Sequence, residues 1–447
     1  MSQHFKGGTR NSMGRNGALA NNGLRRTHIW VGAIIITLLC AISGYFITEI
    51  YRLPDQIKLV EGKANKISYD LPFKATIENE SQAVLKVNNA SVADNFSFDL
   101  NDLNVMESNK AGSATMTLNM FGLPVKKIDI DILPDIELAP CGMAVGVRIN
   151  TNGVMVLGAG HVNGEDGKNY NPSDGILRAG DLILKANDCE LNGKDDLMQA
   201  VQDSKGAINF QVKRGEELIE AKVTPVIAAS DGENKIGVWV RDGTQGIGTI
   251  TYYNPSTNKF AALGHGIMDV DTKRLMSVKN GEIRESNVTS VVKGRKGAPG
   301  ELIGDVNGKN IIGRVERNSP YGIFGSIDIR AQSFMPKERM KIGLQNVIHE
   351  GPAKILATVE GTSAREYDIY IEGINRGNAS DDTKGMVIRI TDPELVMKTN
   401  GIVQGMSGSP IMQDNRIIGA VTHVFVQEPS KGYGIFIENM LKYETSS

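Results

Sequence analysis

An uncharged apolar segment near the amino end places the strongest constraint on how this chain of 447 residues can fold. It covers residues 29–47 (IWVGAIIITLLCAISGYFI), and nineteen helical residues at about 1.5 Å each nearly match the ~30 Å hydrocarbon core of a bilayer. Residues 1–28 are basic, and no acidic residue precedes Glu49. A positive flank keeps the amino end in the cytoplasm, so we expect a cytoplasmic tail over 1–28, a membrane segment over 29–48 and export of the rest.

Two interpretations of the apolar segment stay open, a retained transmembrane anchor and a cleaved signal peptide, because its length suits both. A buried core helix fits poorly, since the segment is apolar on every side. A lipoprotein signal at Cys40 also fits poorly, because bulky Leu39 stands where such signals want a small residue. We therefore predict a protein exported across the cytoplasmic membrane and either anchored to it by this helix or released from it.

The exported part has the composition of a mainly β protein. The chain holds 50 glycines and only 6% aromatic residues, which indicates many turns and short strands. Residues 125–133 (VKKIDIDIL) alternate apolar and charged side chains with the period of a half-buried strand, and we assign 50–135 to a small β-rich domain. The 49 basic and 51 acidic residues nearly balance, so we expect no nucleic-acid partner. The cysteines show no metal-ligand spacing, which predicts no metal site and leaves the pairing of Cys141 with Cys189 open.

Residues 136–228 have a different sequence pattern, which resembles that of a PDZ domain. The segment GILRAGDLI (175–183) resembles the G-I-L-x-x-G-D-x-I element of that fold, and we expect a helix over Asp195–Gln202 and a strand over Ile208–Arg214. PDZ domains bind an extended peptide as an added strand and hold its terminal carboxylate with backbone N–H groups. The residues expected to border that groove are Met143, Ala144, Val145, Gly146 and Val147. The alternative is a structural β module that binds no peptide.

The run GMSGSP, residues 405–410, is either an ordinary glycine-rich turn or a turn that presents a nucleophile. The G-x-S-x-G elbow of the α/β-hydrolases is excluded, because Ser409 occupies its last position and a strand–turn–strand pattern follows instead of a helix. The fragment G-x-S-G-x-P instead resembles the nucleophile turn of chymotrypsin-like peptidases. Glycines at positions 405 and 408 permit a tight turn around Ser407, which would direct the N–H groups of Gly405 and Ser407 into one oxyanion hole.

A serine nucleophile needs a base, normally a histidine within hydrogen-bond reach. Once the cytoplasmic tail and the PDZ-like region are set aside, three histidines remain: His265, His349 and His423. His423 lies on the apolar face of RIIGAVTHVFV (416–426), where we expect a structural strand histidine, and His349 has no distinguishing context. His265 follows a strand-like run and has glycine on both sides, so the backbone can project its imidazole from a strand end. Ser407 and His265 are the candidate nucleophile and base.

These residues lie within a wider resemblance to the stage IV sporulation protein B peptidases, secreted serine peptidases of spore-forming bacteria. The resemblance runs from the membrane segment to the C-terminus, and its most specific stretches are GIGTITYYNP, ALGHGI, VIRITDP and GIVQGMSGSPI followed by GAVTHVFV. It implies a chymotrypsin-like double β-barrel over residues 236–447 and a catalytic set of Ser407, His265 and Asp392, with no metal or organic cofactor. From chemistry alone, other acids are as plausible as Asp392 for orienting His265: Asp269, Asp271 and Asp305.

The resemblance also implies a role in sporulation. A forespore would secrete such a peptidase into the space between the two membranes of the sporangium. There it would cleave itself and then a membrane-associated regulatory protein. Cleavage of the regulator would allow a late mother-cell sigma factor to be activated. Two other classes stay open: a PDZ-containing peptide-binding signalling protein whose peptidase domain is inactive, and a purely structural exported β protein.

Overall fold

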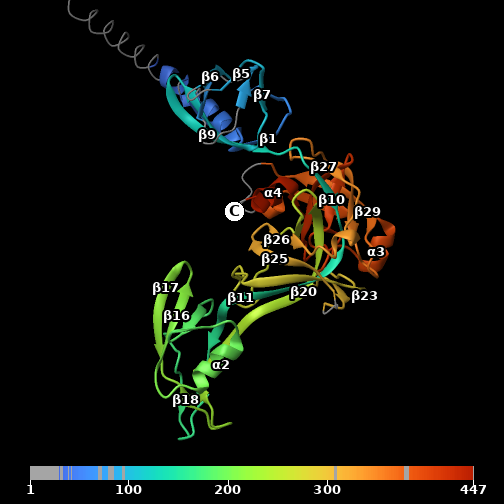
Figure 1. The fold of residues 1–447 in the computed structure, drawn as a ribbon. Helices are drawn as coiled ribbons and strands as arrows, with labels where there is room; N and C mark the ends of the chain where they lie inside the picture. The colour runs from blue at the N-terminus through green and yellow to red at the C-terminus, as the bar shows by residue number, and fades with distance from the viewer. Residues whose placement is uncertain are drawn as a thin grey trace, which may run out of the picture. The chain divides into compact units, whose positions relative to one another are not determined.

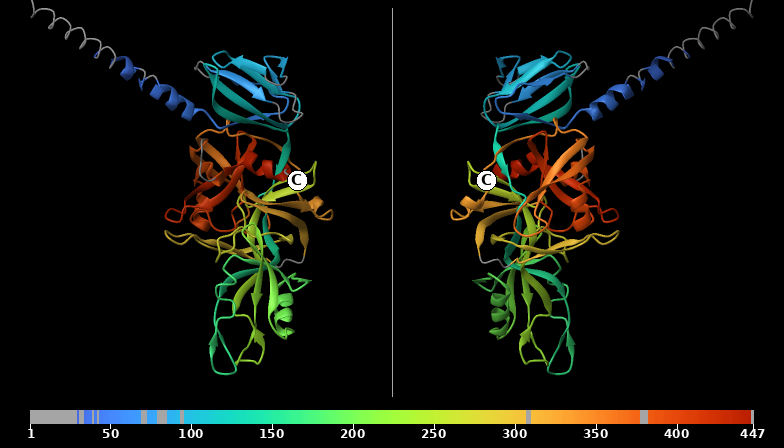
Figure 2. Two further views of the ribbon diagram at one scale, coloured as in Figure 1. Left: turned by 90° about the vertical axis from the view of Figure 1, so that its left-hand side faces the viewer. Right: turned by 90° about the vertical axis from the view of Figure 1, so that its right-hand side faces the viewer.

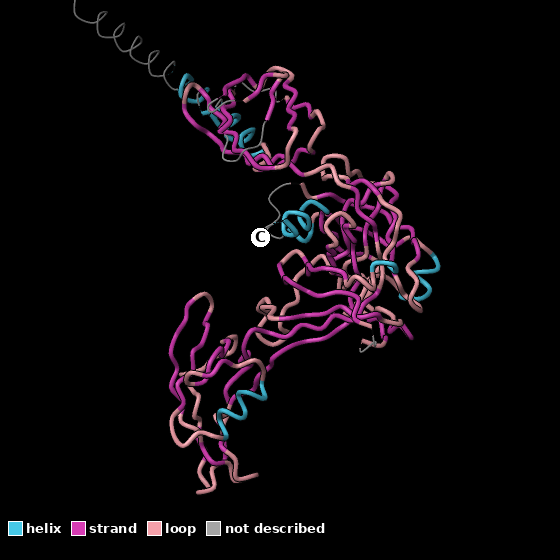
Figure 3. The backbone as a smooth tube through the Cα atoms, viewed as in Figure 1, coloured by secondary structure: helices cyan, strands magenta, loops and turns pink. Residues whose placement is uncertain are grey.

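The computed structural model describes residues 30, 34–38, 40–41, 43–68, 73–78, 85–92, 96–306, 310–376 and 382–445. Strands make up most of the described chain, as Figure 3 shows, so the mainly β fold predicted from glycine content and alternation is confirmed. The chain divides into two compact units, Met1–Pro134 and Asp135–Ser447. The predicted cytoplasmic tail, 1–28, lies outside the described residues.

A helix at the amino end of the first unit, Ile34–Arg52, is the one described helix that is long and apolar enough to cross a membrane. A signal sequence passes the same test, so a signal and a transmembrane anchor both fit the length and composition of this helix. Its carboxyl end is fixed to the first β domain. Lys126 Nζ donates hydrogen bonds to the carbonyl oxygens of Ile50, at 3.3 Å, and Leu53, at 2.5 Å.

The rest of the first unit is a small β domain with its own apolar core. A five-stranded sheet has the order β1-β9-β8-β3-β6, and a four-stranded sheet has the order β2-β7-β4-β5. On β9, Ile128, Ile130 and Ile132 are buried while Lys127 and Asp129 are exposed, as the alternation predicts. Its strands are β1 Gln56–Val60, β2 Asn65–Ile67, β3 Lys74–Glu78, β4 Leu85–Val87, β5 Ala90–Ser91, β6 Phe96–Asp99, β7 Asn104–Ser108, β8 Gly112–Met120 and β9 Leu123–Leu133.

Six strands of the second unit pair in a closed ring, which is a β-barrel. Each strand is hydrogen-bonded to the next in the order β11-β20-β21-β26-β25-β22, and β22 returns to β11. The inward residues, including Val145, Ile250, Phe260 and Ile323, form a buried core. The strands of this first barrel are β11 Ala144–Ala159, β20 Val238–Asn254, β21 Lys259–Ala262, β22 Asn280–Glu285, β25 Ile311–Ser319 and β26 Gly322–Ile327.

Six later strands close into a second barrel. The pairing order is β28-β29-β30-β33-β32-β31, and β31 returns to β28. This barrel has a separate core, which includes Ile355, Ile388, Met406 and Ile411. Two closed barrels are what the predicted double β-barrel requires. The strands are β28 Gly351–Ala357, β29 Arg365–Ile374, β30 Met386–Ile390, β31 Pro410–Gln413, β32 Arg416–Val424 and β33 Lys431–Phe436, and α4, Ile437–Thr445, follows β33.

The PDZ-like region is inserted into the first barrel, because β11 and β20 extend beyond it. Residues 144–150 of β11 belong to the barrel, whereas residues 155–159 pair with Val238–Arg241 of β20 outside it, after a shift in register. Figure 1 and both views of Figure 2 show the two strands running together into this module. Its other main elements are β14 Leu182–Ala186, β15 Cys189–Glu190, α2 Lys194–Gln202, β16 Ile208–Arg214 and β17 Glu217–Val223.

This arrangement corrects the predicted peptide groove over Met143–Val147. Val145 and Val147 point into the barrel core, and residues 145–147 are paired on one edge with β20 and on the other with β22. A strand paired on both edges has no backbone groups left for an added peptide. The prediction was wrong because β11 belongs to both the first barrel and the PDZ-like module. From sequence alone, its barrel part looks like the first strand of the module.

Shorter elements connect or flank these substructures. They are β10 Glu137–Pro140, β12 Val162–Asn163, β13 Asn169–Tyr170, β18 Val226–Ile227, β19 Asn234–Lys235, β23 Val288–Val292, β24 Glu301–Gly304, η1 Gln332–Phe334, β27 Met340–Ile342, η2 Asp382–Lys384 and α3 Pro393–Thr399.

Candidate active site

A pocket of about 540 Å³ lies between the two barrels and contains both Ser407 and His265. The first barrel contributes Leu263, residues 265–268 and part of β20, and the second contributes residues 402–405 and the end of β32. No acidic or basic side chain other than histidine is among the described residues that line it. The pocket is therefore suited to uncharged groups.

The turn around Ser407 has the form that its glycines predict. Gly405 and Gly408 both have φ of 97°, a conformation that side chains with a Cβ rarely adopt. Met406 is fully buried in the second core, and Ser409 is also fully buried, so Ser407 is the serine of this run that reaches the pocket. The Ser407 hydroxyl donates to the Thr422 carbonyl at 2.8 Å.

Two backbone N–H groups of this turn have no acceptor among the described residues. The neighbouring amides are satisfied: Met406 donates to Val403, Gly408 to Val421 and Ser409 to Met406. Among the described residues, the amides of Gly405 and Ser407 have no such acceptor, and both residues line the pocket. Buried amides are nearly always paired, so two free ones beside a serine suit a developing negative charge.

His265 stands directly after a strained turn at the end of β21. The amide of Gly264 donates to the Ala262 carbonyl at 2.9 Å, which closes a γ-turn around Leu263, whose φ is 71°. A positive φ is uncommon for leucine and is often found at functional sites. This turn bends the chain out of the strand and brings His265 into the pocket.

The imidazole of His265 has a defined tautomer. Its Nδ1 lies 3.0 Å from the Gly266 carbonyl oxygen, which can only accept, so Nδ1 carries the proton and Nε2 is left as the acceptor. Burial lowers the pKa of His265 below its ordinary value, against the opposite effect of the Gly266 carbonyl. A neutral imidazole with a free Nε2 is the form that a general base requires.

His423 also belongs to this pocket, which corrects the expectation of a structural strand histidine. Its side chain is exposed, and its ring lies against that of His265 with centroids 4.9 Å apart. The cause is a register shift between Val421 and Val424 in the pairing of β32 with β33. Such a bulge reverses the facing of the following side chains, and an apolar alternation cannot reveal it. The third candidate, His349, instead pairs with Asp414 on the surface.

Asp392 does not line the pocket with Ser407 and His265. It is the N-cap of α3, where its Oδ1 accepts from the Leu395 amide at 2.9 Å. Its Oδ2 is 3.5 Å from the Asp368 amide. The structure therefore gives Asp392 a capping role, and the orienting role implied by the family resemblance has no support in these contacts.

The three alternative acids are not hydrogen-bonded to His265 either, within the described residues. Asp269 is buried and its carboxylate binds Arg241 and Thr272, while Asp271 pairs with Arg241. Asp305 is exposed beyond the end of β24. What fixes the His265 tautomer here is a backbone carbonyl. No group of three metal-ligating side chains occurs in the described part of the chain, and Cys141 and Cys189 are both free thiols.

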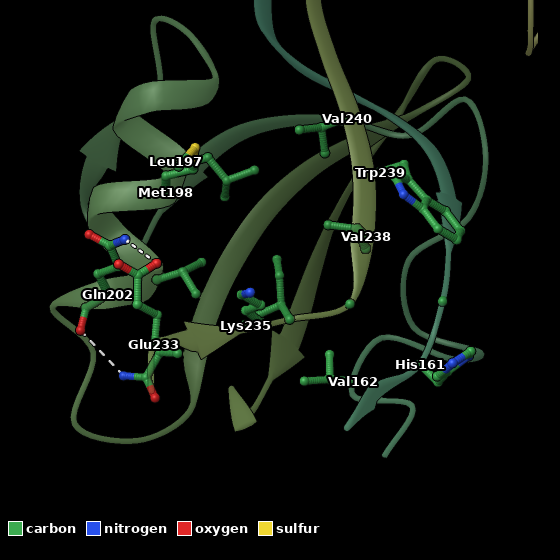
Figure 4. Close-up of a pocket in the computed structure, with 15 residues that line it drawn as sticks. His161, Val162, Leu197, Met198, Gln202, Glu233, Lys235, Val238, Trp239 and Val240 are labelled. Carbon is green, nitrogen blue, oxygen red and sulfur yellow. Dashed lines mark hydrogen bonds between the residues drawn. The ribbon is translucent and has the colours of Figure 1, made fainter. Parts of the chain in front are cut away.

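A second pocket, of about 310 Å³, lies in the PDZ-like module between α2 and β20 (Figure 4). Leu197, Met198 and Gln202 of α2 face Val238 and Val240 of β20 across it. All described pairings of Val238–Arg241 are with β11, so the other edge of this strand faces the pocket. A helix opposite an open strand edge is the arrangement that accepts an added peptide strand.

Two barrels with a serine and a histidine in the pocket between them form the arrangement of the two-barrel serine peptidases. The family model described as SpoIVB peptidase S55 matches residues 232–441. Residues 232–441 thus match the SpoIVB peptidase family, a family of serine peptidases, which supports the family prediction for the C-terminal part of the chain. No curated protein matches the chain.

The two roles of Asp392 can be separated by substitution. Asparagine caps helices about as well as aspartate, whereas alanine costs about 0.5–2 kcal/mol of stability. We expect Asp392→Asn to keep both the unfolding free energy and the rate at which a fluorophosphonate labels Ser407, and Asp392→Ala to lower stability. Denaturant unfolding and labelling rates measure both effects. A stable Asp392→Asn variant that no longer labels would establish Asp392 as the orienting acid instead.

The depressed pKa of His265 predicts the pH dependence of labelling. Because burial disfavours the imidazolium, the neutral base persists below the ordinary pKa of 6.5. The labelling rate should therefore rise with pH, pass its midpoint below 6.5 and be close to its plateau at neutral pH. His349→Gln, a change at an exposed histidine, is the control and should leave the profile unchanged. A midpoint above 6.5 would contradict this assignment.

Proposed function

We propose that this protein is an exported serine endopeptidase in which Ser407 is the nucleophile and His265 the general base. The observation that carries the proposal is the pocket between the barrels, which holds both side chains together with two amides that have no acceptor among the described residues. For reaction, the Ser407 hydroxyl leaves the Thr422 carbonyl and donates to Nε2 of His265.

The reaction then follows from these positions. Ser407 Oγ attacks the peptide carbonyl carbon as His265 takes its proton, and the N–H groups of Gly405 and Ser407 bind the oxyanion. The loss of one such donor costs roughly 10²–10³ in rate. The His265 imidazolium gives the proton to the leaving amine, and water, deprotonated by the same histidine, releases the acyl group. The uncharged pocket favours substrates with apolar or small polar side chains at the cleaved bond.

The biological substrates that we propose are the chain itself and a membrane-associated regulatory protein. This rests on the family and on the apolar helix, which would hold the peptidase domain at the outer face of the cytoplasmic membrane. In a sporulating cell this corresponds to secretion from the forespore into the intermembrane space. Cleavage of the regulator there would start the signalling that activates a late mother-cell sigma factor.

The pocket between α2 and β20 supports a second proposed activity, the binding of an extended peptide. The side chains facing each other across it are mainly apolar, and the strand edge offers backbone groups for pairing. This replaces the groove predicted at Met143–Val147 and keeps the PDZ-like role. A peptidase domain without activity would leave this binding as the protein's sole function.

Self-cleavage distinguishes an active peptidase from an inactive binding protein. We expect the full chain to produce fragments over hours, Ser407→Ala to produce none, and Ser409→Ala to behave as wild type because Ser409 is buried. Denaturing electrophoresis of the purified proteins measures this. Identical fragments from wild type and Ser407→Ala would exclude self-cleavage by Ser407.

The peptide groove can be tested with a phage-displayed library of heptapeptides with free carboxyl termini. We expect the wild-type chain to enrich binders and Met198→Glu, which places a charge on the groove wall, to lose them at least about tenfold. Leu218→Glu is the control, because Leu218 is similarly exposed in the same module but does not line the groove. Equal binding by Met198→Glu, or no enrichment by wild type, would contradict the assignment.

A further inference from the structure

The segment that carries His265 is held at its base by the first barrel. We call residues 264–276 the His265 loop. Asn318 Oδ1 accepts from the Ile267 amide at 2.9 Å, and its Nδ2 donates to the carbonyls of Ile267, at 2.8 Å, and Met276, at 2.9 Å. One asparagine therefore joins both ends of the loop to β25.

The tip of the His265 loop is held by the PDZ-like module. Arg241 of β20 donates through Nη1 to Asp269 Oδ2, and its Nη2 lies 2.9 Å from Asp271 Oδ2. Arg274 of the loop donates to the Gly180 carbonyl of the module at 2.9 Å. These contacts make the module part of the support of the base.

Of these contacts, the ion pair between Arg241 and Asp269 would be the most costly to break. Asp269 is only 1% exposed, and its Oδ1 accepts from the amide of Thr272, at 2.8 Å, from the Thr272 hydroxyl, at 2.9 Å, and from the amide of Asp271, at 3.1 Å. A buried carboxylate that loses its cation is strongly destabilised, so the loop tip would have to move toward water. The position of the loop thus depends on Arg241 staying in place.

Arg241 is also part of the strand that forms the groove. Val238 and Val240 line the groove, Arg241 follows at once, and Thr244–Ile247 of the same strand line the pocket with Ser407 and His265. A displacement of β20 at the groove is therefore passed directly to the residue that holds the His265 loop.

We propose that Arg241 and Asp269 are positioning residues for the reaction at Ser407, and that their ion pair makes the strand of the peptide groove and the base of the active site move as one. The role rests on the proposed peptidase activity. Neither residue lines the pocket that contains Ser407 and His265. They act through the His265 loop, so an occupied groove would stabilise the loop in its reactive position.

The test measures how fast a fluorophosphonate labels Ser407 in the full chain, at a temperature where circular dichroism shows every variant folded. We expect Arg241→Met to slow labelling about 10- to 100-fold, the loss expected when a catalytic group is misplaced by about 1 Å. The midpoint of the pH profile should remain below 6.5, because the loop is displaced and the chemistry of the base is unchanged.

Arg214→Met is the matched control. Arg214 pairs with Asp181, which is also 1% exposed and lies in the same module, but neither is in the His265 loop. The control loses a comparable ion pair and should label at close to the wild-type rate. We also compare the double variant, Arg241→Met with Asp269→Asn, with the two single variants. Its labelling rate should match that of the slower single variant and not fall further, since the two residues act as one unit.

Three results would overturn the role. The first is that Arg241→Met labels at the wild-type rate. The second is that Arg214→Met slows labelling as much as Arg241→Met does. The third is that the slowing factors of Arg241→Met and Asp269→Asn multiply in the double variant. A wild-type chain that takes up no probe at Ser407 would overturn the proposed peptidase, and the positioning role with it. The two failures are thus distinguished by the wild-type protein alone.

Discussion

The geometry of the active site depends on one buried threonine. Thr249, on β20, donates from Oγ1 to the Gly405 carbonyl at 2.7 Å and from its amide to the Ser407 carbonyl at 3.1 Å. Its own carbonyl accepts from the Leu263 amide at 3.1 Å, at the γ-turn before His265. The segments of the proposed nucleophile and base, from different barrels, are therefore fixed to the same residue. A Cβ at Gly408 would lie 2.1 Å from the Thr249 oxygen, so the contact also explains that glycine.

The proposed base, His265, is oriented differently from the histidine of the usual Ser-His-Asp set. A carboxylate beside a histidine fixes the tautomer and also stabilises the imidazolium that forms during reaction. The Gly266 carbonyl fixes the tautomer of His265, but it carries no full charge and therefore stabilises the imidazolium only a little. His423, whose ring is tilted against that of His265, adds no negative charge either. The position of His265 thus matters more here than its electrostatic surroundings, which gives weight to the contacts that hold its loop.

Much of the peptidase core could be predicted from sequence because its signals are local. Glycines at 405 and 408 demanded the turn at Ser407, and glycine on both sides of His265 indicated a strand end. The N-cap role of Asp392 was also readable, since aspartate followed by proline and glutamate is a typical helix start. The family resemblance instead assigns Asp392 to the orientation of His265.

Other features depend on pairings between distant residues, which a single sequence does not contain. The bulge in β32 that turns His423 into the pocket is one. The insertion of the module between two halves of β11 and β20 is another, and it misled the assignment of Met143–Val147. The link between Arg241 and Asp269 joins residues 28 positions apart through the fold alone.

The continuous strands β11 and β20 have a consequence for any cut within the module. A domain joined by a flexible linker separates once its linker is severed. Here residues 144–150 pair along their length with 243–249, and residues 155–159 pair with 238–241. A chain nicked between residues 160 and 237 would remain hydrogen-bonded across both strands. Such a protein would give two fragments in denaturant yet migrate as one particle in its native state.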